Sequence, residues 1–184
     1  MLTEDVINEC ARMLGLLSEN ESGEKILEES DREKLLAAVG YTADEIARDY
    51  VPLISEQTFD VKEDKRIKYG DFEREPIAVL RVKRGGANLT FERLYDSLQL
   101  GCSGTVKVKY AFKPPQTALG GEMPWKDSVV PLRVLAYGAA TEYSLMSGQT
   151  SDAQMWDKRY RDALERMLLH LNSGRKTPRR RWLG

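Results

Sequence analysis

The single histidine, His170, is the first residue of the 184-residue chain to test for catalysis, because an imidazole titrates near neutral pH. A catalytic base would need a nucleophile and an orienting carboxylate, and a metal ligand would need companion histidines or cysteines. The sequence contains no H-x-x-x-H motif and no cysteine–histidine cluster. His170 falls in the last turn of an expected helix, where a cation suits the helix dipole. We therefore predict neither a catalytic nor a metal-binding role for it.

Two glycine-containing segments could in principle cradle a phosphate: Gly85-Gly86 and Gly101-Cys102-Ser103-Gly104. A phosphate loop needs its glycines to open a helix and normally a following Lys-Ser/Thr pair. Both segments border expected strands, so both are predicted to be turns. Cys10 and Cys102 lie in unrelated patterns, which predicts two reduced structural thiols without a disulfide.

Carboxylates are plentiful, but in the first two expected helices they occupy the solvated faces. Two of them could still meet in a cleft, so a glycosidase-like acid pair stays open without a motif to support it. With that alternative noted, we expect no catalytic residues, no cofactor and no bound metal, and a chain that is not an enzyme.

The composition is that of a soluble globular protein, with 41% apolar and 31% charged residues. No apolar run approaches the roughly 20 residues that span a bilayer. The first residues lack the basic and then apolar pattern of a signal peptide. These features predict a protein made in the cytosol that does not bind membranes.

The charge is distributed unevenly along the chain. Residues 175–184 (RKTPRRRWLG) carry five of the 28 basic residues and no acid, which leaves 23 basic and 29 acidic groups elsewhere. We predict that this arm docks onto a partner protein, with Trp182-Leu183 as an apolar anchor in a groove or in an added strand. Binding of a nucleic-acid backbone, with Trp182 stacked on a base, and a disordered end without a role remain alternatives. The candidate partner-binding residues are Arg175, Lys176, Arg179, Arg180, Arg181, Trp182 and Leu183.

Apolar residues at three- and four-residue steps predict two helices in the N-terminal part of the chain. The first spans residues 3–17 and is capped by Thr3. The second begins at Ser30, which forms a capping box with Glu33, and ends near Pro52.

Two further helices are predicted in the C-terminal part. The third begins at Asp127 or Ser128 and runs to about Met146. It is apolar nearly all round, which is typical of a helix buried in a core or an interface. The fourth is capped by Ser151 and ends at Gly174.

The middle of the chain follows the two-residue period of strands. Phe59 and Val61 alternate with polar residues, Ile67 follows a charged turn, and Ile77–Val82 is rich in β-branched residues. In Gly104–Lys113, valines and aromatic residues alternate with lysines and an alanine, which predicts an antiparallel strand with one buried and one solvated face.

The order of elements predicts an α+β fold with a four-helix bundle-like core and an inserted antiparallel β lobe. The expected parts are N-terminal helices in 1–56, the β lobe in 57–116, C-terminal helices in 117–174 and a basic arm in 175–184.

Three segments carry a resemblance to a known family. They are ARDYVPL (47–53) leading to Phe59, GTVKVKY (104–110) followed by Pro114, and LAYGAATEY (135–143) with the later WDKRY (156–160) and the closing Arg-Arg-Arg-Trp. In order and spacing the chain resembles the head–tail connector, or adaptor, proteins of tailed bacteriophages and prophages of Gram-positive bacteria. The likeness spans nearly the whole chain and contains no catalytic signature.

The resemblance implies a structural subunit of the virion neck, made in the bacterial host cytoplasm. In such adaptors a helical bundle carries a strand-rich lobe, and about a dozen copies form a ring beneath the portal. The implied partners are the portal protein, other copies of the chain, a tail-completion or stopper protein, and DNA that passes transiently through the channel. The arm would dock on the portal, with Arg179–Arg181 on an acidic surface and Trp182 in a pocket.

A second class of function stays open, namely a cytosolic nucleic-acid-binding or regulatory module that uses the basic arm. The excess of acids outside the arm argues against it, because non-specific binding depends on neutralising several phosphates.

Overall fold

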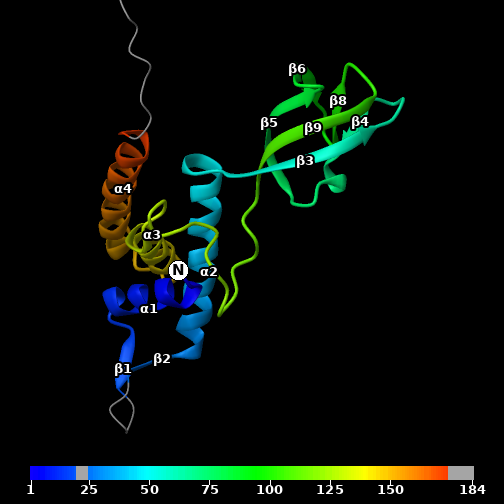
Figure 1. Ribbon diagram of the computed structural model, residues 1–184. Coiled ribbons are helices and arrows are strands. Elements are labelled where there is room, and N and C mark those ends of the chain that lie inside the picture. The colour runs from blue at the N-terminus through cyan, green and yellow to red at the C-terminus, as the bar shows by residue number, and fades with distance from the viewer. Residues whose placement is uncertain (20–24, 174–184) are drawn as a thin grey trace, which may run out of the picture. The chain divides into compact units, whose positions relative to one another are not determined.

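The computed structural model describes residues 1–19 and 25–173 (Figure 1). The chain divides into two compact units. The first, here the helical unit, contains residues 1–43 and the chain from Gln116 onward. The second, here the strand unit, is Asp44–Pro115.

Helix α1 (Thr3–Leu14) buries Val6, Ile7 and Cys10 on one face, as the sequence pattern predicts. Its start differs from the prediction, because Thr3 lies inside the helix and its hydroxyl faces Met123 Sδ at 3.7 Å. The backbone N–H of Leu2 donates instead to Asp5 Oδ2 at 2.8 Å. The helix ends at Gly15, whose φ of 70° is the left-handed conformation that glycine adopts without strain.

Residues beyond Gly15 form a small hairpin in place of the last turn of the expected helix. Strands β1 (Leu17–Glu19) and β2 (Lys25–Leu27) pair as a two-stranded antiparallel sheet. Helix α2 (Glu29–Glu45) then begins before Ser30, so Ser30 is not its N-cap, and it continues into a π-helical turn (Ile46–Tyr50).

Helices α3 (Leu132–Met146) and α4 (Thr150–Ser173) follow the strand unit. Helix α3 begins later than predicted, directly after Pro131, and the carboxylate of Asp127 accepts a hydrogen bond from the Leu132 N–H at 2.8 Å. It is buried along most of its length and packs extensively against α4 and α1.

Gly138 lies where α3 passes close to α2 and α4. A Cβ at this position would overlap Thr42 Cγ2 of α2 and lie 3.1 Å from the Tyr160 ring of α4. The missing side chain therefore allows α3 to pass close to both helices. Tyr143, further along α3, donates a 2.8 Å hydrogen bond from its hydroxyl to Asp31 Oδ1 of α2.

The strand unit holds a four-stranded antiparallel sheet in the order β3-β9-β5-β6 (Figure 1). Its strands are β3 (Leu53–Val61), β9 (Gly104–Phe112), β5 (Pro76–Arg84) and β6 (Ala87–Leu89). A three-stranded antiparallel sheet has the order β4-β8-β7, from β4 (Arg66–Lys68), β8 (Ser97–Leu100) and β7 (Phe91–Arg93). A 3₁₀ turn, Tyr69–Asp71, follows β4.

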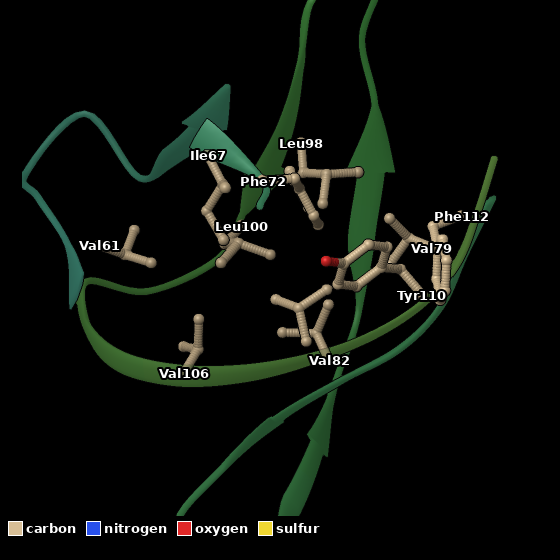
Figure 2. Close-up of a cluster of buried hydrophobic side chains, with 11 residues drawn as sticks. Val61, Ile67, Phe72, Val79, Val82, Leu98, Leu100, Val106, Tyr110 and Phe112 are labelled. Atoms are coloured by element: carbon tan, nitrogen blue, oxygen red, sulfur yellow. The ribbon is translucent and has the colours of Figure 1, made fainter. Parts of the chain in front are cut away.

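Both sheets contribute to one core in the strand unit (Figure 2). Val106, Val108 and Tyr110 of β9 point inward, and their side chains are almost inaccessible to solvent. The Phe72 ring packs edge-on against Tyr110 with centroids 4.7 Å apart. The remaining members of the cluster are Val61, Ile67, Val79, Val82, Leu98, Leu100 and Phe112. This burial fixes which face of the four-stranded sheet points to solvent.

The expected four-helix bundle with a single inserted β lobe is therefore wrong. The described residues form four α-helices and three antiparallel sheets, and one of the sheets, β1–β2, lies outside the segment predicted as the lobe. The extensive helix packing in the described residues joins α3 to α4 and to α1, and does not join four helices into one bundle. The apolar pattern through Leu17 suggested a longer helix, whereas Gly15 ends it and frees the next residues to pair as strands.

Candidate docking surface

The solvent-facing side of strands β3, β9 and β5 follows from the strand register. Because Val106, Val108 and Tyr110 point into the core, the lysines between them face outward. Lys109 lies opposite Glu56 on β3 and Arg81 on β5. Lys107 lies opposite Thr58 on β3 and Lys83 on β5. The register thus brings four cations together on two adjacent strands.

A β-bulge on β5 adds an exposed aliphatic side chain to this side. The register shifts between Val79 and Arg81, so Leu80 has no partner on β9. Val79 and Val82 are both buried, and the two residues between them, Leu80 and Arg81, are both exposed. Leu80 is 47% exposed, and Ile54 on β3 is 48% exposed.

We call this surface the outer sheet face. It consists of Ile54, Glu56, Leu80, Arg81, Lys83, Lys107 and Lys109.

Glu56 is the acid at the centre of the outer sheet face. Its carboxylate lies 3.0 Å from Lys107 Nζ and 3.9 Å from Arg81 Nη2. The hydrogen bond from Lys107 holds the pKa of Glu56 below its usual value, and the charges of Lys107, Lys109 and Arg81 act in the same direction. Glu56 therefore sits among four cations, and with Asp60 further along the same side of β3 the outer sheet face still carries an excess of positive charge.

The arrangement of these cations is unfavourable for the isolated sheet. Arg81 and Lys109 are direct cross-strand partners, and so are Lys83 and Lys107. Like charges directly opposite each other on neighbouring strands destabilise a sheet. The face is therefore better suited to an acidic partner surface than to water alone.

Residues singled out from the sequence as candidates for chemistry lie in separate elements of the fold. His170 is exposed in the last turn of α4. Gly85 and Gly86 both have positive φ, at 53° and 90°, and form the turn between β5 and β6, as predicted. Residues 101–103 join β8 to β9, and Gly104 is the first residue of β9.

The two cysteines are both free in the structure. Cys10 is fully buried on α1, and this burial raises the pKa of its thiol to about 12. It is therefore a protonated, packed side chain at neutral pH. Cys102 is half-buried in the turn before β9.

In residues 1–19 and 25–173, no group of three or more His, Cys, Asp or Glu side chains could hold a metal ion. Within the same ranges, no helix combines the length and the apolar character needed to cross a membrane.

The predicted docking arm, Arg175, Lys176, Arg179–Arg181, Trp182 and Leu183, lies outside the described residues. The outer sheet face, by contrast, was not singled out from the sequence. Its signal was present in Arg81-Val82-Lys83 and Lys107-Val108-Lys109, which both alternate cations with a buried valine.

Comparison of the chain with models of known protein families and with curated proteins finds no match.

Proposed function

We propose that the chain is a structural head–tail connector, or adaptor, subunit of a tailed phage. In this role it assembles with its own copies into a ring beneath the portal, joins the head to the tail and lets DNA through. The resemblance in the segments 47–59, 104–114 and 135–160 supports the family. The single structural observation that carries the docking role is the outer sheet face.

The outer sheet face has the chemical character of a protein-binding surface. Ile54 and Leu80 are each nearly half exposed beside Arg81, Lys83, Lys107 and Lys109. Protein–protein interfaces typically combine exposed apolar side chains with polar and charged ones. Aliphatic side chains gain nothing from a phosphate backbone, whereas they are buried favourably against another polypeptide. The surface therefore favours an acidic protein partner over a nucleic acid.

The arm supplies the second proposed contact. Its five cations suit an acidic portal surface, and the Trp182-Leu183 pair suits an apolar pocket. In this proposal the arm binds the portal, and the folded units hold neighbouring copies.

The proposal is tested by comparing the full chain with a chain that ends at Gly174. The portal protein of the same phage or prophage serves as bait in a binding assay, and circular dichroism confirms that the shorter chain folds. We expect the shorter chain to fold and to lose portal binding. Two variants, Arg179→Gln/Arg180→Gln/Arg181→Gln and Trp182→Ala, separate the contribution of charge from that of the apolar anchor.

The same chains distinguish the nucleic-acid alternative. A short fluorescein-labelled DNA duplex is titrated with each chain at about 50 and about 200 mM salt. Tight, salt-sensitive DNA binding that disappears with the arm, together with unchanged portal binding, would contradict the connector role.

A further inference from the structure

The helical unit carries a surface that complements the outer sheet face in both charge and apolar character. It lies where the loop before α3 meets the start of α1. Thr3 N–H donates to Gly121 O at 2.9 Å, and Met123 N–H donates to Met1 O at 3.1 Å. Leu2 and Glu122 form the β-bridge between these two hydrogen bonds. These contacts hold the loop before α3 against the start of α1.

We call this surface the N-terminal corner, and define it by Leu2, Glu4, Asp5, Leu119 and Glu122. All five are exposed, and the two leucines are 40% and 44% exposed. A turn that closes with the hydrogen bond from Gly121 N–H to Ala118 O carries Leu119 next to the bridge. The corner thus presents two aliphatic side chains and three carboxylates, and no basic side chain belongs to this set.

Outside the basic arm, the charge of the helical unit has the same sign as the corner, and with the five cations of the arm included the excess of acids falls from seven to two. Residues 1–43 and 116–173 contain 17 acidic and 10 basic residues. A cationic face that approaches this unit from another molecule is therefore attracted before it makes contact.

We infer that copies of this chain contact each other head to tail, with the outer sheet face of one copy on the N-terminal corner of the next. The inference rests on the proposed function, because it names the surfaces through which the copies meet. Ile54 and Leu80 contact Leu2 and Leu119, and the cations contact the three carboxylates. Two different surfaces meet, so the contact is heterologous and repeats from copy to copy; it closes into the ring of the proposed function when the rotation between copies closes.

The match in both charge and apolar character favours a second copy of the chain over other partners. The sheet face presents two aliphatic side chains beside an excess of cations, and the corner presents two aliphatic side chains beside three acids. The contact also places an acid opposite the cross-strand pairs Arg81–Lys109 and Lys83–Lys107, which offsets their mutual repulsion.

Charge reversal tests the contact without harming the fold. The variant Lys83→Glu/Lys109→Glu reverses the face but keeps the pair between Lys107 and Glu56. At position 83 it turns a like-charge cross-strand pair into an opposite-charge pair, and at position 109 it exchanges the attraction to Glu56 for an attraction to Arg81. Urea unfolding then shows whether the sheet keeps its stability, so that lost assembly is separated from a weakened sheet.

The complementary variant is Glu4→Lys/Glu122→Lys at the corner. Sedimentation velocity at low salt should show that each variant alone self-associates at least about tenfold more weakly than the wild type. Mixing the two variants should restore assembly in alternating order, because each reversed surface then meets its complement. The four changes combined in one chain should also restore it. Lys62→Glu/Lys68→Glu, with the same charge change at exposed positions outside the face, should assemble like the wild type.

The outcomes separate this inference from the proposed function. Full assembly by both single-surface variants, or no recovery in the mixture, overturns the named contact, while portal binding and assembly of the wild type still support a connector. Loss of DNA binding by Lys83→Glu/Lys109→Glu with unchanged assembly would assign the face to nucleic acid and also overturn it. A wild type that stays monomeric with and without portal contradicts the proposed function itself.

Discussion

Arg81 on β5 and Lys109 on β9 are direct partners in the antiparallel register, so two cations face each other across neighbouring strands. Lys83 and Lys107 repeat the arrangement two residues away. Each such pair costs stability in the free molecule, and Glu56 offsets only part of it through Lys107 and Arg81. This surface is unfavourable in isolation and carries exposed aliphatic side chains. Both properties are expected of a surface that docks onto a partner.

Replacing Lys83 by Glu should therefore stabilise the isolated chain. The change converts the cross-strand pair with Lys107 to an attractive one, and the neighbour on β6 is the neutral Asn88, so we expect the free energy of unfolding to rise by about 0.2–1 kcal/mol. Urea unfolding at low salt, at concentrations where the chain is monomeric, measures it. The gain should shrink in high salt, and Lys62→Glu should show none. A loss of stability would contradict the register-based account of this face.

Gly138→Ala should destabilise the helical unit. The new methyl group overlaps Thr42 and crowds Tyr160, and overpacking of this kind costs about 1–3 kcal/mol. Gly40→Ala in α2 is the matched control, because its Cβ meets Thr117 Oγ1 at an ordinary 3.4 Å. There the higher helix propensity of alanine should add about 0.5–1 kcal/mol. Thermal or urea unfolding of both variants distinguishes tight packing from a general effect of adding a methyl group.

The Tyr143–Asp31 hydrogen bond predicts a pH dependence on the alkaline side. Burial raises the pKa of Tyr143 above its usual value of 10.0, and the hydrogen bond to Asp31 acts in the same direction. The folded state therefore holds this proton more tightly than the unfolded state. The resulting stability is complete below about pH 10 and is lost as the pH rises through the raised pKa.

Tyr143→Phe removes both the hydrogen bond and this titration. We expect a loss of about 1 kcal/mol at pH 7, since Asp31 keeps access to water. Above about pH 10 the unfolding free energies of the variant and the wild type should converge. Urea unfolding of both chains from neutral to alkaline pH follows the difference, and a gap that widens with pH would contradict the assignment.

The two thiols should differ in reactivity. Cys10 is buried and has a pKa of about 12, so a thiol reagent near pH 8 should not reach a thiolate there. Cys102 is half-buried and should react in the native chain. Labelling with a chromogenic disulfide should modify one thiol per chain, and the second only in denaturant. Cys102→Ser, as the control, should leave the native chain unreactive.

The local patterns predicted most of the secondary structure in the described residues. The alternation of apolar and polar residues in 104–113 identified β9 and its buried face, because the polarity of each residue in a strand indicates which side of the sheet it lies on. Helix ends were less predictable. Thr3 and Ser30 have the chemistry of N-caps, yet the backbone enters both helices earlier, and Thr3 is held against Met123 from a distant loop. The β1–β2 hairpin was missed, because three-residue strands carry too short a pattern.

The docking surface depends on information that local patterns do not contain. Lys107 and Lys109 were predicted to be solvated, but their pairing with Arg81 and Lys83 requires the register between β5 and β9. The exposure of Leu80 next to Arg81 comes from a bulge, and the sequence pattern of Ile77–Val82 does not predict it. The N-terminal corner likewise joins residues more than a hundred positions apart.

The central proposal, a structural subunit that assembles with its own copies and the portal, is tested most directly by mass photometry and electron microscopy of the full chain with the portal protein of the same phage or prophage. The account predicts ring-shaped complexes on the portal, with a mass that gives the number of copies. Monomers that neither form rings nor bind the portal, at any salt concentration, would contradict it.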